Sequence, residues 1–188
     1  LMPLYDSYCF SNLTTLFSHL LGTGVETQMP LQVLGDSPHF FKKIVFIYLD
    51  AFGWDVFEKI NRKSSLLARI LEEGTVSKIT SQFPSSTAPH VTSIHTGMGV
   101  GESGIYEWFQ YVPEVDNIIT PLLFSLGYDR ERNRLLDLGF DPEKIFPTAT
   151  FYQHLREHGI ESYIFQSSAY TPSPISDVVF RGSSKVVP

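Results

Sequence analysis

Residues 42–50 read Lys-Lys-Ile-Val-Phe-Ile-Tyr-Leu-Asp, and six consecutive apolar or aromatic residues in this stretch precede a carboxylate. Such a continuous run is typical of a strand buried on both faces, as in a parallel sheet, because a half-exposed strand alternates apolar and polar residues. Apolar periodicity predicts two helices next, over 54–60 and 66–71, with Gly74 ending the second. β-Branched residues over 75–81 predict a second strand. The expected order is β-α-β.

The flanking regions predict further helices. A helix is expected over 4–21, with Asp6 or Ser7 as its N-cap and an apolar stripe that includes Leu16 and Leu20. Another is expected over 87–96, opened by a hydroxyl residue and ended by the glycines that follow.

Later segments repeat the alternation less strongly. Residues 105–124 are aromatic and interrupted by prolines, which indicates short strands or loops, and residues 128–147 are charged and expected to form a solvated excursion. A helix over 151–158 and a strand over 162–166 follow. The tail from Ser167 shows no strong element. These patterns predict an α/β fold.

Composition limits the classes of protein that fit. The 188 residues correspond to about one domain, and 43% hydrophobic with 14% aromatic residues excludes a disordered chain. The net charge of −6, with scattered Lys and Arg, argues against bulk nucleic acid as a partner. Cys9 is the only cysteine, so it forms no intrachain disulfide and fits a reducing compartment.

Targeting signals are weak in this sequence. The longest strongly apolar run, 44–49, is far shorter than the ~20 residues of a membrane span, and no secretory leader is recognisable. We therefore expect a cytoplasmic protein without membrane contact. The glycosylation sequon at Asn12 is expected to go unused.

Two short motifs have ordinary structural explanations. Gly99–Gly104 spells G-x-G-x-x-G, but it follows a predicted helix rather than a strand, which favours a glycine turn over dinucleotide binding. His154 and His158 spell H-x-x-E-H, and a zinc peptidase would need a third ligand such as Glu161 or Asp177. A histidine in the last turn of a helix also interacts favourably with the helix dipole. Neither motif alone identifies a function.

Asp50 and Thr87 form the strongest pair of candidate site residues. A carboxylate directly after a buried strand lies at the sheet edge where open α/β folds bind ligands, although an Asx turn or a helix cap would also place an aspartate there. A hydroxyl at a helix N-terminus meets unpaired N–H groups and the positive end of the dipole, although it could also be an ordinary N-cap. Two divalent ions would activate such a hydroxyl and clamp a phosphoryl group, with Asp50 as a ligand.

Three ordered blocks carry a family resemblance: IVFIYLDAFGW from Ile44, FPSSTAPHVTSIHTG from Phe83 and GESGIYEW from Gly101. Together they resemble the alkaline phosphatase superfamily, and most closely the soluble prokaryotic type I phosphodiesterase/nucleotide pyrophosphatase group. The resemblance implies a three-layer α/β/α fold with a mostly parallel central sheet. It also implies a two-zinc hydrolase, with Asp50 as a metal ligand and Thr87 as both a metal ligand and the nucleophile that is transiently phosphorylated.

The sequence departs from the family pattern in two ways. His90 stands where the phosphodiesterase branch usually has an asparagine that contacts the substrate phosphate, and a neutral imidazole can still donate one hydrogen bond there. Family members take their remaining zinc ligands from a later half of the fold, which these 188 residues do not contain. We therefore expect residues 1–188 to be the N-terminal part of one alkaline-phosphatase-like domain, inactive alone, with a possible cap or excursion at 105–147.

The sequence thus predicts a metal-dependent hydrolase of a small phosphate ester or nucleotide, with zinc as the metal. A catalytically silent α/β fragment or binding module is the alternative, with the glycine loop and the aromatic segment from Gly104 to Tyr111 contacting a partner. The zinc peptidase based on His154 and His158 is a third reading.

Overall fold

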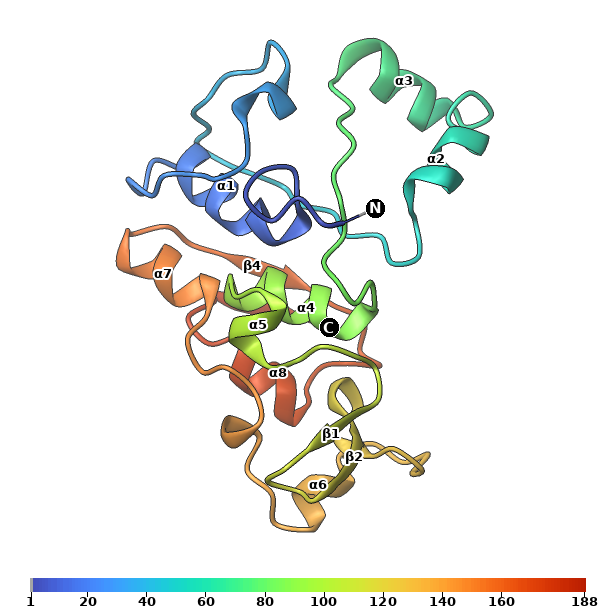
Figure 1. The fold of residues 1–188 in the computed structure, drawn as a ribbon. Coiled ribbons are helices and arrows are strands. Elements are labelled where there is room, and N and C mark those ends of the chain that lie inside the picture. The colour runs from blue at the N-terminus through green and yellow to red at the C-terminus, as the bar shows by residue number, and fades with distance from the viewer. Residues whose placement is uncertain (1) are drawn as a thin grey trace. The chain divides into compact units, whose positions relative to one another are not determined.

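The structure is a computed structural model that describes residues 2–188, and it divides into two compact units, one ending at Thr80 and one running from Ser81 to Pro188 (Figure 1). The helices of the first unit are η1 (Phe10–Asn12), α1 (Leu13–Leu20), η2 (Leu31–Leu34), α2 (Trp54–Ile60) and α3 (Ser65–Glu73). Its small core consists of Leu16, Leu20 and Met29, all buried. The two predicted helices at α2 and α3 are confirmed.

The predicted N-terminal helix is shorter than expected. Residues before Phe10 form turns, because the side-chain amide of Asn12 donates to the carbonyls of Tyr5 and Ser7, at 2.8 and 2.7 Å, and holds them in a loop. Helix α1 begins only at Leu13. The side-chain nitrogen of Asn12, to which a glycan would be attached, is therefore hydrogen-bonded within the protein, and the residue is buried.

The apolar run from Ile44 to Leu49 is not a paired strand, so the prediction of a strand buried on both faces is wrong for this structure. Its side chains still alternate with the period of a strand. The ring of Phe46 lies 5.1 Å from that of Phe17, whereas Val45 and Ile47 are 86% and 74% exposed. The segment thus packs one face on α1 and leaves the other uncovered.

The predicted second strand over 75–81 is also wrong. Its one strand-like contact in the described part of the chain is a parallel bridge between Thr80 and Cys9. Ser77 and Thr75 instead donate their hydroxyls to the carbonyls of Val33 and Leu34. β-Propensity alone does not form a strand, because a strand needs a hydrogen-bonded neighbour.

The second unit is built around helix α4 (Thr87–Thr96), which buries seven of its ten residues and packs against α7 (Phe151–Glu157) and α8 (Pro174–Val179). The prediction of α4 is confirmed at both ends, and Gly97 follows in the left-handed conformation with φ of 78°. Helix α5 (Val100–Ser103) lies on the glycine motif. The expected helix at α7 is also confirmed, with Gly159 at φ of 71°.

Two small sheets complete this unit. Strands β1 (Gln110–Val112), β2 (Asn117–Thr120) and β3 (Ser125–Leu126) form an antiparallel sheet, and β4 (Tyr163–Phe165) pairs in parallel with β5 (Lys185–Val187). The short strands expected in 105–124 and the strand at 162–166 are confirmed. The chain is α/β, but the sheets that the structure contains are small and partly antiparallel, unlike the large parallel sheet expected from the family resemblance.

Two segments are more ordered than predicted. The charged region 128–147 contains α6 (Arg134–Asp137) and η4 (Pro142–Lys144), and it buries Leu135 and Phe146 in the core. The tail expected to lack structure forms α8 and β5. The core that joins all these elements contains Ala88, Ile105, Val112, Ile119, Phe124, Leu135, Phe146, Ile164, Ile175, Val178, Val179 and Phe180.

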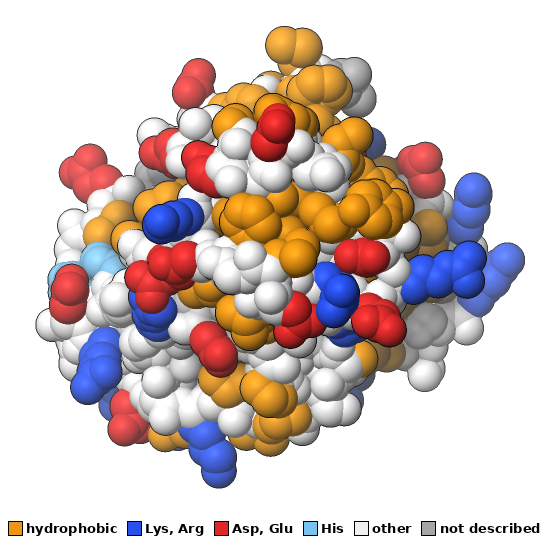
Figure 2. Space-filling view, turned by 90° about the horizontal axis from the view of Figure 1, so that it is seen from below, with side chains coloured by type: hydrophobic (Ala, Val, Ile, Leu, Met, Phe, Trp, Pro, Cys, Tyr) orange, Lys and Arg blue, Asp and Glu red, His pale blue; other side chains and the backbone are white. Residues whose placement is uncertain are grey.

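The surface is mixed in character. On the face seen in Figure 2, acidic side chains are interspersed with basic ones, and apolar side chains lie between them. Within residues 2–188, none of the helices has the length and apolar content required to cross a bilayer.

Candidate functional site

Asp50 lies in a turn directly after the apolar run. Its carboxylate accepts a hydrogen bond of 2.9 Å from the backbone N–H of Ala51, which has a φ of 56° in the left-handed region. A positive φ is uncommon for alanine and marks a locally strained backbone. Burial and the neighbouring negative charge of Asp50 raise the pKa of Tyr48. The Asp50 carboxylate is exposed, but the sheet edge at which the sequence places it does not form, because the run before it is not a paired strand.

The residues after Asp50 are held by an aromatic contact. The ammonium group of Lys78 lies 5.2 Å from the centre of the Trp54 ring, within the range of a cation–π interaction. Trp54 also contacts Phe57 one turn further along α2, at 5.4 Å between ring centres. The start of α2, four residues after Asp50, is thus fixed to the segment that leads to Thr80.

Thr87 is the first residue of α4 and is half-buried. Ser86 occupies the N-cap position with an extended backbone, but its side chain makes no capping hydrogen bond. Position N3 is Pro89, which has no N–H to donate, so a capping bond to that position cannot form. Thr87 therefore lies at the dipole's positive end, in a first turn that the Ser86 hydroxyl does not cap.

His90 holds the loop that precedes Thr87. Its Nε2 accepts the backbone N–H of Gln82 at 3.0 Å, so the ring proton is on Nδ1, which donates to the carbonyl of Ser86 at 2.7 Å. The ring is buried, and both nitrogens bond to the loop backbone. The phosphate contact expected of His90 would require one of these bonds to open.

The loop also contains a buried amide. Gln82 is 1% exposed, and its Oε1 accepts the N–H of Val100 at 3.2 Å, which joins the loop to the start of α5. Within residues 2–188, no acceptor lies in reach of the Gln82 Nε2. Sequence reasoning missed this residue, because a lone glutamine before a proline loop carries no recognisable signal.

Glu107 lies in the third of the three sequence blocks, GESGIYEW, and sequence reasoning assigned it no role. Its Oε1 accepts the N–H of Trp108 at 2.7 Å. The Ser86 side chain, and less strongly this N–H, lower the pKa of Glu107.

The two histidines of the H-x-x-E-H motif lie side by side on α7, with 4.6 Å between their ring centres. His158 Nδ1 donates to the carbonyl of His154, while His154 Nε2 is buried without a hydrogen-bond partner among the described residues. In the part of the chain that the structure describes, no three side chains of His, Cys, Asp or Glu gather as a possible metal site. A third ligand to this pair is therefore not found there.

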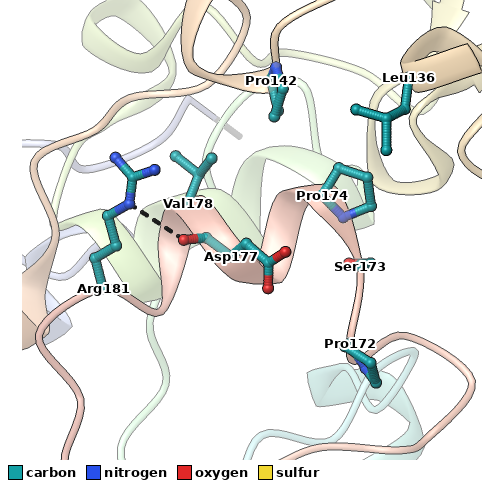
Figure 3. A pocket seen from close by; sticks show the side chains of 8 residues that line it. All are labelled: Leu136, Pro142, Pro172, Ser173, Pro174, Asp177, Val178 and Arg181. Atoms are coloured by element: carbon teal, nitrogen blue, oxygen red, sulfur yellow. Dashed lines mark hydrogen bonds between the residues drawn. The ribbon is translucent and has the colours of Figure 1, made fainter.

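Asp177, one of the possible third ligands, lines a pocket of about 330 Å³ in the second unit. Three prolines, Leu136 and Val178 form its walls, and in Figure 3 the Arg181 side chain donates to the backbone carbonyl of Asp177 rather than to its carboxylate. The guanidinium of Arg181 also pairs with Glu143, which lowers the pKa of that carboxyl. This pocket contains none of the predicted site residues Asp50, Thr87 and His90.

The candidate residues before position 124 lie in a part of the chain that matches a known protein family. Residues 44–123 match the type I phosphodiesterase / nucleotide pyrophosphatase family. This family segment, as we call residues 44–123, begins at the apolar run and contains Asp50, Thr87, His90 and Glu107. The family resemblance predicted from the three blocks is confirmed over this range. Neither a curated protein nor a solved structure matches the chain.

The family consists of phosphodiesterase and pyrophosphatase hydrolases, which act on small phosphate esters or nucleotides. Asp50 belongs to the first structural unit, and Thr87, His90 and Glu107 belong to the second. In the second unit, His90 bonds to the carbonyl of Ser86, the residue directly before Thr87.

Proposed function

We propose that this protein hydrolyses phosphodiester or pyrophosphate bonds of a small phosphate ester or nucleotide, with Thr87 as the nucleophile. The observation that carries the proposal is the family segment, in which a half-buried threonine begins a ten-residue helix. The helix dipole and the first-turn N–H groups favour negative charge at that point. A transferring phosphoryl group is the substrate that would gain most from it.

The proposed reaction has two balanced displacements. In the first, the Thr87 Oγ forms a bond to phosphorus, the bond to the leaving alcohol or nucleotide breaks, and the leaving oxygen takes up a proton. In the second, water forms a bond to phosphorus, the bond to Thr87 Oγ breaks, and the threonine hydroxyl is restored. Two displacements through a covalent intermediate divide one difficult step into two easier ones.

Two divalent metal ions, zinc in this proposal, are the cofactors, with Asp50 and Thr87 as the ligands that this chain supplies. When bound, they would neutralise charge on the phosphoryl oxygens and lower the cost of the threonine alkoxide. Asp50 fits because its carboxylate is exposed and rigidly placed by the Ala51 bond. Because residues 2–188 gather no three-ligand cluster, the remaining ligands are proposed to come from polypeptide outside these residues.

We propose that the same additional polypeptide completes the three-layer fold. Val45, Ile47 and Leu49 expose one apolar face of a segment whose other face packs on α1. Burying such a face stabilises a protein by about 25 cal/mol per Å² of apolar surface. A flanking strand and a second helix layer would bury it, with residues 1–188 forming the N-terminal part of the domain and 105–147 forming an excursion from it.

His90 is proposed to lie beside the bound phosphate, one helical turn after Thr87. Direct donation to a phosphoryl oxygen would need the Nδ1 proton that now bonds to the Ser86 carbonyl. The imidazole therefore contributes first by shaping the loop. A His90→Asn variant, which restores the residue usual in the family, keeps a donor and tests whether the substrate contact matters.

The nucleophile is tested by trapping the intermediate. The full-length protein with zinc is mixed with bis-p-nitrophenyl phosphate, quenched in acid, and digested for mass spectrometry of the peptide that carries Thr87. We expect Thr87 to carry the p-nitrophenyl phosphoryl group that remains after one p-nitrophenolate leaves. We also expect a fall of about 10³-fold or more in kcat for Thr87→Ala, and partial retention of activity in Thr87→Ser, which keeps a hydroxyl. Undiminished turnover by Thr87→Ala would refute the assignment.

A catalytically silent binding module is the second candidate, and one observation favours it. Phe109, Tyr111 and Ile118 are each about half exposed on the outer face of the antiparallel sheet, with Tyr111 directly opposite Ile118. Such an apolar patch suits a protein partner. Zinc uptake and hydrolysis of bis-p-nitrophenyl phosphate separate the two candidates, because a silent module would show neither.

A further inference from the structure

The two histidines at the end of α7 form a compact pair of imidazoles. His154 lies in the helix, His158 is its C-cap, and their ring centres are 4.6 Å apart. Residues four positions apart lie on the same face of a helix, one turn from each other. Two nitrogens that bind one zinc ion tetrahedrally, at about 2.0–2.1 Å each, lie about 3.3 Å apart. Small side-chain rotations would bring nitrogens of these two rings to that separation.

The ring of His158 already has the tautomer of a metal ligand. Its Nδ1 lies 2.9 Å from the carbonyl oxygen of His154, which can only accept a hydrogen bond, so Nδ1 carries the ring proton. The lone pair of Nε2 is therefore available to a metal ion, and the residue is exposed. Histidines that bind metals almost always donate their other ring N–H to a carbonyl, a carboxylate or water, which fixes the tautomer in this way.

The ring of His154 supplies an independent observation. Its Nε2 is buried and has no hydrogen-bond partner within residues 2–188. Buried polar atoms are normally paired, because an unpaired one loses its bonds to water without replacing them. A metal ion between the two rings would give this nitrogen a partner. His158 is exposed, so rotation of its ring would open a path for the ion from solvent.

The position of the pair at the end of a helix also suits a cation. The last carbonyls of a helix are unpaired within it, and they give its C-terminal end a partial negative charge. The segment 154–161 contains two carboxylates, Glu157 and Glu161, against one guanidinium, Arg156. The local charge therefore favours a bound divalent ion.

We propose that His154 and His158 together bind one divalent transition-metal ion, with water completing its coordination. Neutral imidazole suits Zn²⁺, Ni²⁺ and Cu²⁺, whereas Mg²⁺ and Ca²⁺ prefer oxygen ligands. The site uses none of the residues proposed for hydrolysis, and it is not a peptidase centre, because no third protein ligand joins the pair within residues 2–188. The ion ties the last turn of α7, a helix that packs against α4, to its C-cap.

The test uses the full-length protein loaded with zinc, and Ni²⁺ as the added ion, because elemental analysis distinguishes nickel from the zinc already bound. The variants are His154→Ala, His158→Ala and the double variant, and the control His39→Ala removes an exposed histidine of the first unit. Thermal unfolding without nickel is measured first, to establish that each variant folds. Bound nickel and zinc are then measured by equilibrium dialysis over a range of Ni²⁺ concentrations.

We expect the wild type and His39→Ala to bind one more Ni²⁺ per chain than the double variant, with no loss of zinc. Each single variant should weaken binding of that ion about 10-fold or more, because one remaining imidazole lacks the gain from a second tethered ligand. If His154→Ala does not fold, the exposed His158→Ala carries the test alone. The proposal is overturned if the double variant binds as much nickel as the wild type, or if His158→Ala keeps the wild-type affinity.

Hydrogen exchange shows where the nickel ion binds. An ion that ties the end of α7 should slow amide exchange in the peptide that covers 151–160 of the wild type, and the same nickel concentration should leave that peptide of His158→Ala unchanged. Unchanged exchange in the wild type at saturating nickel would overturn the assignment to this pair. Neither measurement follows hydrolysis, so the outcome does not depend on the proposed role of Thr87.

Discussion

The hydrogen bond between His95 and Tyr152 makes the stability of the second unit sensitive to acid. His95 Nδ1 lies 2.6 Å from the hydroxyl of Tyr152, and its ring meets Phe180 edge-on at 4.7 Å between centres. Burial lowers the pKa of His95 to about 4 and raises that of Tyr152. The histidine is therefore neutral in the folded protein, and Tyr152 donates its proton to Nδ1.

The sign of the effect follows from the two pKa values. An unfolded histidine has a pKa near 6.5, so between about pH 6.5 and 4 the unfolded chain binds a proton that the folded one does not. Stability is therefore complete above pH 6.5 and is lost as the pH falls toward 4. Proton linkage gives a loss of about 2 kcal/mol between pH 7 and pH 5, and about 1–2 kcal/mol is expected because the residue keeps partial contact with water.

The assay is urea unfolding at pH 7, 6 and 5, followed by tryptophan fluorescence, on the wild type and on His95→Gln. The glutamine oxygen can accept the Tyr152 proton but does not titrate, so its stability should vary less over this range. Glu107 and Glu143 have lowered pKa values, so they destabilise the fold only below about pH 4.5 and do so equally in both proteins. If wild type and His95→Gln lose the same free energy between pH 7 and 5, the reasoning is refuted.

Two further outcomes are expected. Gly182→Ala should destabilise the protein by more than about 2 kcal/mol in urea unfolding, because φ is 87° and the new Cβ would lie 2.5 Å from the backbone nitrogen of Gln153. The control Gly139→Ala has a similar φ but open space around the new Cβ, so it should cost about 1 kcal/mol. Equal losses of stability in the two variants would contradict this expectation. The His154→Ala/His158→Ala double variant should keep hydrolysis of bis-p-nitrophenyl phosphate within about twofold of wild type, and a loss similar to that of Thr87→Ala would favour the zinc peptidase reading instead.

Local signals in the sequence predicted the helices well. Helix α4 begins and ends where the proline in its first turn and the glycine after it indicate, and α7 carries a capping box between Thr150 and Gln153. Helix α8 was missed although Ser173 precedes Pro174 and bonds reciprocally with Ser176, which is the same kind of signal. Pro174 starts this helix, because a proline in the first turn has no N–H that the helix would need.

Non-local contacts account for the remaining errors in the fold. The 44–49 run has the composition of a buried strand, but pairing depends on partners that composition does not specify. Charged residues in 128–147 concealed the buried Leu135 and Phe146, because a short amphipathic segment contributes only one or two side chains to the core. Periodicity detects a long regular face and misses an isolated anchor.

In the candidate site, too, local sequence signals identified some residues, whereas contacts between residues that are far apart in the sequence were not predicted. Asp50 and Thr87 were identified from their places at the end of an apolar run and the start of a helix, and both lie there. His90 was placed one turn after Thr87, but its bonds to Gln82 and Ser86 follow from the path of a loop that no periodicity describes.

Buried glutamine side chains join parts of the chain that local rules treat separately. The Gln82 Oε1 accepts the N–H of Val100, and the Gln110 Oε1 accepts the N–H of Tyr106. Both bonds lie within the family segment, which extends past β2 to residue 123, well beyond α4. Periodicity identifies α4 but gives no sign of the loops that these two side chains hold, because a single buried amide has no repeating pattern.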